Sequence, residues 1–502
     1  MELTQTESEQ GGWYLLADSP DALRAVINFL THRDKKSFRG VCSAARLAVD
    51  STVASLHLEF EEEEGEDDSP EFIEGQPLFI NEDEEDAYYL ERLHESSASK
   101  NFPGSGECFP DATAVCIENC AFSKLTLQLL DGASSRWRNL ECLQLNNCRF
   151  GRRDHTETLF ALASQVWPCL HILELCNGGL TSVDLANLAK MQAKNLTELD
   201  LSDNKITSLM ELADASWPVL NSFVLCRNTA LEINTESLAL VISVFPKLDD
   251  LDLSGVPLVA REVAVLSQAQ WPSLTWLTLS CCGLKDAALA PLAPPDFETE
   301  IEASNEEDTG SFNSLEYKIE KLHLRGFSNL ERLDLSGNNL QTAAGINYLC
   351  SAAPHLPKLT SLDLSSNAQL RGDALAALEH SFWPRLETFE ASNMVLSTPA
   401  IAGLTSASLP RLRSLILRNS IMSWAAVDQL ATGQWNQLRK LDLGGLNGVH
   451  LRRAGPSLST ASWPRLKTMI LRKSPVRIKT MNRKGLLLLL ENWPDLKVRC
   501  ES

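Results

Sequence analysis

A short alternation of apolar and polar residues recurs along most of this chain. Its clearest copy is NLTELDLSDNKI at residues 195–206, with leucine at 196, 199 and 201 and asparagine at 204. The alternation at Leu199 and Leu201 has a period of two residues, which predicts a short strand with one buried face. The amide of Asn204 can bond free backbone groups where the chain turns sharply. Each copy therefore predicts a strand followed by a turn.

The register returns at a nearly constant interval. The first leucine of each copy stands at 140, 170, 196, 220, 248, 274, 330, 359, 386, 412, 438 and 466. The intervals are 24–30 residues, except for one of 56, which we interpret as two units with an irregular copy at Ile319, Leu322 and Leu324. A degenerate earlier copy lies at Val115, Ile117 and Cys120. These intervals predict about thirteen stacked repeats with a continuous core.

A Trp-Pro pair precedes many of the predicted strands. Proline ends helices, so the unit is expected to run strand, turn, helix and corner, with the large apolar residue filling the corner. Eight of the eleven tryptophans occupy this position, which favours a structural role over a ligand platform. Helices are expected at 235–244, 287–292, 373–380 and 424–430, with Asp286 and Ser423 as caps and Thr398 before a first-turn Pro399.

The pattern Leu-x-x-Leu-x-Leu-x-x-Asn resembles the leucine-rich-repeat superfamily from about residue 111 to the C-terminus. The resemblance implies an α/β solenoid, a horseshoe whose strands line the concave face. Repeats of 24–30 residues leave room for a helix on the convex face, which favours the ribonuclease-inhibitor-like intracellular type.

Changes in composition predict the domain organisation. Residues 1–50 form a helical segment, and 51–60 a first strand similar to those of the repeats. Residues 61–107 form an acidic, largely disordered insertion, because residues 59–107 hold 18 acidic and 2 basic side chains. The solenoid then occupies 111–293 and 319–502, with a C-terminal cap, and an acidic loop at 294–318 interrupts it.

The N-terminal helical segment resembles an F-box. The matching residues are Ser19-Pro20-Asp21-x-Leu23, Ile27, Leu30, Asp34 and Gly40-Val41-Cys42. An F-box docks a substrate receptor on a Skp-type adaptor within a cullin–RING ubiquitin ligase. The resemblance implies adaptor contacts at Pro20, Leu23, Ile27, Leu30, Val41 and Cys42. The alternative is a helical cap over the first repeat, which binds no adaptor; Ser19 stands where an F-box usually has leucine.

The residues between the repeat leucines are expected to project from the concave face. Many are acidic, and the net charge of the chain is −21. The predicted partner-binding residues are Glu174, Glu198, Asp200, Asp250, Asp252, Asp334, Asp363, Glu390 and Asp442. Such a negative stripe favours a basic protein partner and disfavours nucleic acid. The alternative is that several of these aspartates only support the repeat, because Leu-Asp-Leu-Ser is a frequent repeat sequence.

No motif for catalysis, phosphate binding or metal ligation occurs, so we expect no enzyme activity, cofactor or metal. The thirteen cysteines lack a C-x-x-C pair and are expected as free thiols. Without a signal-like or membrane-spanning segment, the expected location is the cytoplasm or nucleus. The sequence predicts a non-enzymatic substrate receptor of an SCF-type ligase. The alternative is a repeat scaffold of a cytoskeletal, axonemal or signalling complex.

Overall fold

The structure is a computed structural model of the 502-residue chain. It describes residues 55–59, 113–118, 121–122, 138–150, 159–160, 162–293, 327–445, 456, 458–470, 493 and 497–499. The chain divides into two compact units. The N-terminal unit comprises residues 1–206 and 211–220, and the C-terminal unit comprises 207–210 and 221–502.

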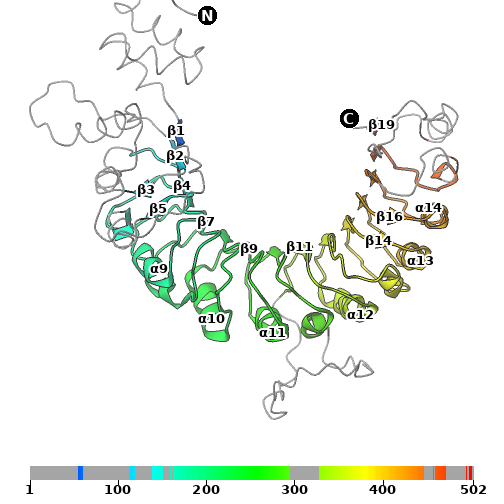
Figure 1. Cartoon of the computed structure of the whole chain (residues 1–502), viewed down its shortest axis with the longest axis horizontal. Coiled ribbons are helices and arrows are strands. Elements are labelled where there is room, and N and C mark those ends of the chain that lie inside the picture. The colour runs from blue at the N-terminus through cyan, green and yellow to red at the C-terminus, as the bar shows by residue number, and fades with distance from the viewer. Residues whose placement is uncertain are drawn as a thin grey trace, which may run out of the picture. The chain divides into compact units, whose positions relative to one another are not determined.

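The N-terminal unit contains parallel strands that pair in chain order (Figure 1). They are β1 (Ser55–Glu59), β2 (Ala114–Glu118), β4 (Cys142–Asn146), β6 (Ile172–Glu174) and β7 (Glu198–Asp200). A second, short parallel pair joins β3 (Ala121–Phe122) to β5 (Arg149–Phe150), and helix α9 spans Ser182–Leu188. The first strand lies within the segment 51–60 that the sequence singled out.

The C-terminal unit continues the same plan with one parallel strand in each repeat. The strands are β8 (Ser222–Val224), β9 (Asp250–Asp252), β10 (Trp276–Thr278), β11 (Arg332–Asp334), β12 (Ser361–Asp363), β13 (Thr388–Glu390), β15 (Ser414–Ile416), β17 (Lys440–Asp442), β18 (Thr468–Ile470) and β19 (Lys497–Arg499). Strands β14 (Val395–Leu396) and β16 (Ile421–Met422) pair separately.

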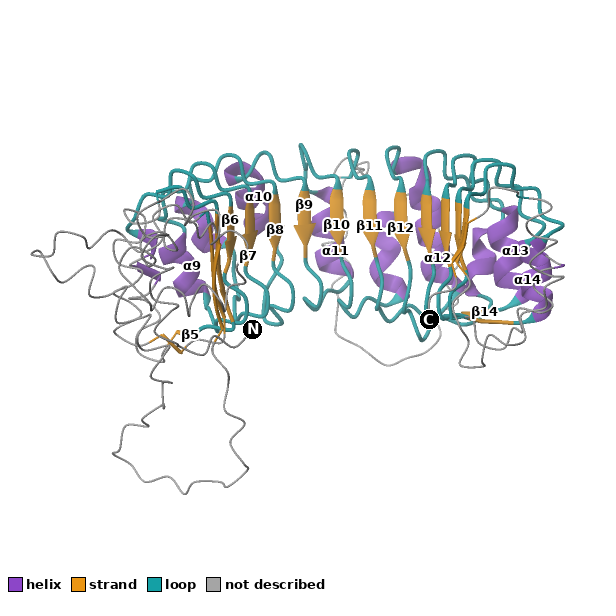
Figure 2. Cartoon of the chain, turned by 90° about the horizontal axis from the view of Figure 1, so that it is seen from above, coloured by secondary structure: helices purple, strands orange, loops and turns teal. Residues whose placement is uncertain are grey.

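Helices lie on one face of the strands in each unit (Figure 2). They are α10 (Thr235–Val244), α11 (Ala260–Gln268), α12 (Ala343–Ala352), α13 (Thr398–Ser406) and α14 (Trp424–Leu430), with 3₁₀ helices η1 (Met210–Asp214), η2 (Asp286–Leu292), η3 (Ala353–His355) and η4 (Ala374–Leu378). The opposite strand face carries the side chains at the first and third positions of the three-residue strands. We call it the open face.

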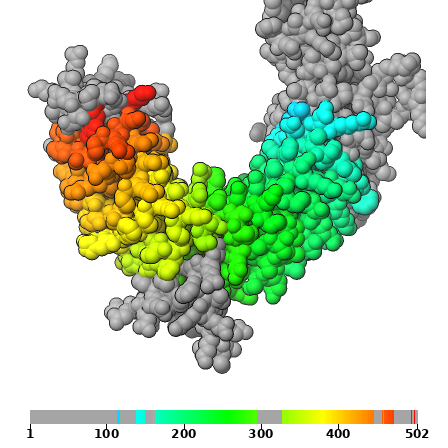
Figure 3. All heavy atoms as spheres, turned by 180° about the vertical axis from the view of Figure 1, so that it is seen from behind, coloured from blue at the N-terminus to red at the C-terminus, as the bar shows by residue number. Residues whose placement is uncertain are grey.

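The middle residue of each three-residue strand points into the core. Leu199, Phe223 and Leu277 are each 0% exposed, whereas their strand neighbours are half-buried or exposed. This confirms the two-residue alternation predicted from the sequence, since successive side chains of a strand point to opposite faces. In the space-filling view, the side chains of successive repeats are in continuous contact from the yellow to the orange part of the chain (Figure 3).

The asparagine of the repeat joins consecutive turns, as predicted. In the N-terminal unit the Asn204 Nδ2 donates to the carbonyls of Leu175 and Leu201, at 2.8 and 2.9 Å. Its Oδ1 accepts from the backbone N–H groups of Gly178 and Leu180, at 3.1 and 3.0 Å. This buried amide thus satisfies backbone groups that would otherwise be unpaired.

The residue before this asparagine position is left-handed in repeat after repeat. Its φ is 57° at Asp203, 71° at Gly255, 67° at Gly337 and 72° at Gly445. Glycine suits this conformation because it has no Cβ. The repeated conformation explains the small and polar residues here, a regularity that the leucine pattern did not predict.

The tryptophans of the Trp-Pro pairs are structural, as predicted. Trp167 and Trp217 are 1% and 0% exposed, and the indole N–H of Trp217 donates to the Met191 carbonyl at 3.1 Å. Toward the C-terminus the rings of consecutive repeats stack. Trp463 lies between Trp435 and Trp493, with ring centroids 6.0 and 6.1 Å apart.

The interpretation of the 56-residue interval as two repeats is wrong. Strand β10 pairs directly with β11, with Leu277 opposite Leu333, so no strand lies between them in the sheet. Across the same junction the Asn338 Oδ1 accepts from the Leu284 N–H at 3.0 Å, as between ordinary neighbouring repeats. The irregular copy at 319–324 therefore supplies no strand there, and residues 294–326 lie outside the described residues.

Helix positions agree with the sequence better than helix caps. Helix α14 begins after Ser423, whose Oγ accepts from the Ala426 N–H, and α10 has the predicted range. Helix α13 is capped by Ser397 and not by Thr398. The predicted cap Asp286 instead lies inside η2, and its carboxylate accepts from Gln341 and Thr342 of the following repeat. Adjacent helix starts lie side by side, so an acidic residue of one repeat can cap the next.

Candidate functional site on the open face

The predicted acidic residues all lie on the strands at open-face positions, in one group in each unit. Glu174, Glu198 and Asp200 belong to the N-terminal unit. The C-terminal unit carries Asp250, Asp252, Asp334, Asp363, Glu390 and Asp442. The predicted adaptor contacts Pro20, Leu23, Ile27, Leu30, Val41 and Cys42 lie outside the described residues.

In the N-terminal group, the carboxylates are largely engaged within the repeat. The Glu174 Oε1 and Oε2 accept from Gln144 and Asn146, at 2.8 and 3.0 Å. The Asp200 Oδ1 accepts from the N–H of Ser202 at 2.8 Å. Burial raises the pKa of Glu198, and the charges of Glu174 and Asp200 raise it further. These contacts favour a role in joining neighbouring repeats.

The aspartates of the C-terminal unit each use one oxygen in the following turn. The backbone N–H two residues later donates to Oδ1 of Asp252, Asp334 and Asp363, at 2.8, 2.7 and 2.7 Å, respectively. The short side chain closes the turn locally. The frequent Leu-Asp-Leu-Ser sequence thus has the supporting role considered above, but it occupies only one oxygen of each of these carboxylates.

Asp442 is the predicted residue that the structure removes from the partner-binding set. Its side chain is 0% exposed. The Oδ1 accepts from the Gly444 N–H at 3.0 Å, and Oδ2 pairs with the Arg418 Nε at 2.5 Å. A buried carboxylate with both oxygens engaged is a structural ion pair. The sequence register could place Asp442 on the correct strand but not next to Arg418.

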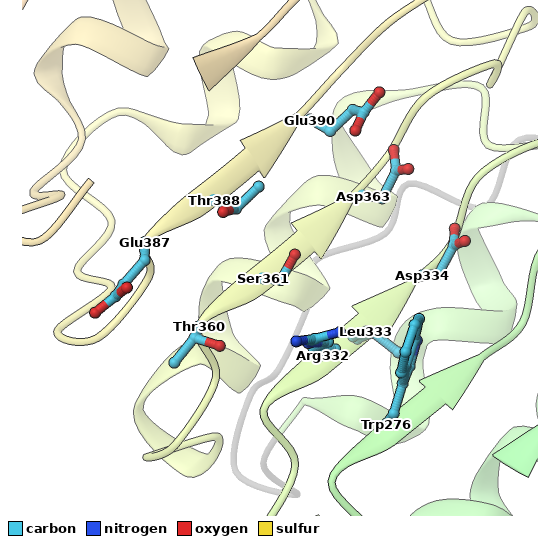
Figure 4. A pocket seen from close by; sticks show the side chains of 10 residues that line it. All are labelled: Trp276, Arg332, Leu333, Asp334, Thr360, Ser361, Asp363, Glu387, Thr388 and Glu390. Carbon is cyan, nitrogen blue, oxygen red and sulfur yellow. The ribbon is translucent and has the colours of Figure 1, made fainter. Parts of the chain in front are cut away.

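Asp334, Asp363 and Glu390 are direct register partners on adjacent strands. Together with Trp276 and Arg332, they line a hollow of about 370 Å³ on the open face (Figure 4). We call this the acidic hollow. Among the described residues, no lysine or arginine forms an ion pair with these three carboxylates.

The acidic hollow has an aromatic side that the sequence did not predict. The Arg332 guanidinium carbon lies 4.7 Å from the centroid of the Trp276 ring, and the indole is 40% exposed. Figure 4 shows this stacked pair beside Asp334. Trp276 occupies the first strand position and not the Trp-Pro corner, which is the sequence signal that could have separated it from the structural tryptophans.

The central carboxylate of the hollow is electrostatically unusual. Burial raises the pKa of Asp363 to about 6, and the neighbouring Glu390 and Asp334 charges raise it further. Hydrogen bonds from Ser365 oppose this shift. A positive group placed between these carboxylates would relieve their mutual repulsion. The geometry therefore suits a cationic side chain.

Models of the leucine-rich repeat match three segments of the chain, at residues 192–209, 329–351 and 355–378. No curated protein sequence matches the chain. Among solved structures, an internalin (inlF) from Listeria monocytogenes is similar with 18% identity and a TM-score of 0.39, over 75% of this chain and 94% of the internalin. A TLR13–ssRNA13 complex is similar with 15% identity and a TM-score of 0.40, over 79% of this chain and 61% of that chain.

The matched repeats and the parallel strand–turn–helix units define a leucine-rich-repeat protein. Domains of this class generally mediate protein–protein interactions, and the matched models describe a repeat and not a catalytic domain. Neither similar structure carries information on the ligand of this chain at these identities. Among the described residues, no helix has the length and apolarity that a membrane crossing requires.

Proposed function

We propose that the open face of the C-terminal unit binds a protein partner, with a lysine or arginine of that partner in the acidic hollow. The observation that supports this is the row of three in-register carboxylates, Asp334, Asp363 and Glu390, which lacks a described cationic partner. The half-buried position of these groups makes their attraction for a cation stronger than that of fully solvated carboxylates. Trp276 adds an aromatic surface next to the bound side chain.

The structure also offers a reason for arginine in the partner. The Arg332 guanidinium already lies flat on Trp276, so a second planar guanidinium could approach the carboxylates beside it. Arginine donates in a fork that matches a carboxylate, whereas lysine offers a compact charge. We expect arginine peptides to bind more tightly than lysine peptides of the same length.

A fluorescein-labelled peptide with alternating alanine and arginine tests the hollow by fluorescence anisotropy. Asp363→Asn with Glu390→Gln is expected to weaken binding about tenfold, which corresponds to about 1.4 kcal/mol. The matched control, Glu232→Gln with Asp428→Asn, changes the net charge equally at exposed residues away from the hollow. An equal loss in both double variants would show that only net charge matters, and the hollow would not be the site.

At the level of the whole protein, we propose a substrate receptor of an SCF-type ubiquitin ligase. The support is the F-box resemblance of residues 19–50, joined to a repeat domain of the protein-binding class. In this proposal the N-terminal segment binds a Skp-type adaptor and, through it, a cullin. The repeats hold the target, and the protein contributes proximity and orientation without bond chemistry.

Co-purification of the full chain with a recombinant Skp-type adaptor tests the receptor proposal. The chain is expected to co-elute with the adaptor, and Leu23→Asp with Ile27→Asp is expected to abolish co-elution. Val259→Asp, at a residue that is 63% exposed, serves as the control for an added charge. Co-elution that survives the double substitution would disprove the proposed contact. Absence of binding by the unaltered chain would favour the scaffold alternative.

A further inference from the structure

Basic side chains line the rim of the open face at the C-terminal end of the chain. Arg413, Arg439 and Lys467 precede successive strands, and Lys497 begins β19. Backbone hydrogen bonds connect them in order: Arg439 N–H to the Arg413 carbonyl at 2.8 Å, Lys467 N–H to Arg439 at 2.9 Å, and Lys497 N–H to Lys467 at 2.8 Å. Because neighbouring strands lie about 4.8 Å apart, these four residues form a closely spaced row. We call them the basic row.

Three members of the basic row have no acidic partner among the described residues. Arg439, Lys467 and Lys497 are exposed, whereas Arg413 pairs with Glu387 at 2.6 Å. The described residues from 414 to 499 contain two acids, Asp428 and Asp442. Asp428 lies on helix α14, on the other side of the strands, and Asp442 is buried with both oxygens engaged. The positive charge of the row is therefore not neutralised locally.

The basic row continues the rim of the acidic hollow. The Glu387 N–H bonds the Thr360 carbonyl and the Arg413 N–H bonds the Glu387 carbonyl, each at 2.8 Å. Thr360 and Glu387 line the hollow. The rim thus changes sign between Glu387 and Arg413, within the C-terminal unit. Opposite charges placed side by side on one face can select partners of complementary charge pattern and orientation.

We propose that the basic row is a second binding site, which takes a short acidic segment of a partner protein. An acidic peptide fits better than a nucleic acid because an extended polyanion would continue toward Glu387 and the acidic hollow. The chain's net charge of −21 also opposes non-specific binding of nucleic acid. Short glutamate or aspartate runs can satisfy the row without reaching the carboxylates.

A fluorescein-labelled peptide of ten glutamates, titrated with the full chain, tests this site. Arg439→Gln with Lys467→Gln is expected to weaken peptide binding at least tenfold. Lys190→Gln with Lys194→Gln makes the same charge change at exposed residues of the N-terminal unit and is expected to change binding less than twofold. Raising the salt concentration from 50 to 200 mM is expected to weaken binding to the unaltered chain, in keeping with a Debye length of about 8 Å near physiological salt.

Other outcomes would overturn the proposal. They are no binding of the peptide, or equal losses in both double variants. Tighter, row-dependent binding of a twelve-nucleotide single-stranded RNA or of phosphatidylserine vesicles would show that the site serves another class of ligand. Thermal melts with midpoints unchanged in both variants ensure that folding is not the cause. Asp363→Asn with Glu390→Gln is expected to leave binding of this peptide intact, so the basic row and the acidic hollow can fail independently.

Discussion

At Asp363, one carboxylate supports a turn and also faces the open side of the strands. The Ser365 N–H donates to Oδ1, while burial and two neighbouring carboxylates raise the pKa of the group to about 6. In the unfolded chain the pKa is near 3.8. Between these values the folded state binds more protons than the unfolded state. The carboxylate therefore makes the folded state less stable as the pH rises through this window.

Asp363→Asn is expected to stabilise the chain at pH 7.5 and to have little effect at pH 4. The asparagine carbonyl can still accept from Ser365, but it carries no charge among Asp334 and Glu390. The gain should be on the order of 1 kcal/mol, because solvent partly screens these groups. Urea unfolding at the two pH values measures it, with the exposed Asp428→Asn as control. A gain that is the same at both pH values would contradict the electrostatic explanation.

Single residues also show what the sequence could predict about the site. The register predicted that Asn204 joins turns and that Asp334, Asp363 and Glu390 project from the strands, because both follow from the position within the repeat. Contacts between repeats do not follow from that position. The pairing of Asp442 with Arg418 and the stacking of Arg332 on Trp276 each join residues of different repeats, and neither was predicted.

At the scale of elements, the start of α12 depends on the preceding repeat. The Asp286 carboxylate accepts from the N–H groups of Gln341 and Thr342, both at 3.0 Å, and from the Thr342 hydroxyl at 2.7 Å. Asp286→Ala is expected to lower stability by about 1–2 kcal/mol, because charged hydrogen bonds are lost at a helix N-terminus. Thermal melts measure the loss, with Asp214→Ala, at an exposed position, as control. A loss no larger than in the control would show that the contact contributes no net stability.

Sequence periodicity predicted most of the described strands and helices but not their capping partners. The range 424–430 agrees with α14 because the apolar spacing and the preceding Ser423 act within one repeat. Asp286 was assigned as the cap of its own helix for the same local reason. The structure places it beside the next helix, a neighbour that linear spacing cannot identify.

At the scale of the whole molecule, the stacking of the repeats across residues 294–326 is uninterrupted. Leu274 and Leu330 are 56 residues apart, yet β10 and β11 pair directly. Deleting residues 297–324, which are 28 residues, would leave an interval of 28, within the 24–30 found elsewhere. The deletion variant is expected to keep its circular dichroism spectrum and to melt within about 2 °C of the full chain, because stability depends mainly on contacts between neighbouring repeats. Loss of cooperative melting would show that this segment contributes a structural repeat.

The fold class was more predictable than the arrangement of the whole chain. A repeated register predicts stacked parallel units, and the paired strands of each unit confirm them. The horseshoe shape, the ribonuclease-inhibitor-like subtype and the number of repeats stay predictions. The F-box resemblance also stays a prediction, because residues 1–54 lie outside the described residues. Length alone could not distinguish one long interval from two repeats, whereas direct strand pairing does.

The stacked tryptophans at the C-terminal end provide an intrinsic optical label. Trp435, Trp463 and Trp493 come from consecutive repeats, and neighbouring rings lie 15–19° from parallel. Indoles at this separation couple electronically and contribute to near-ultraviolet circular dichroism, whereas the more isolated corner tryptophans contribute singly. Unfolding that starts at the C-terminus would therefore change this signal before total fluorescence falls. The protein can report the direction of its own unfolding without an added dye.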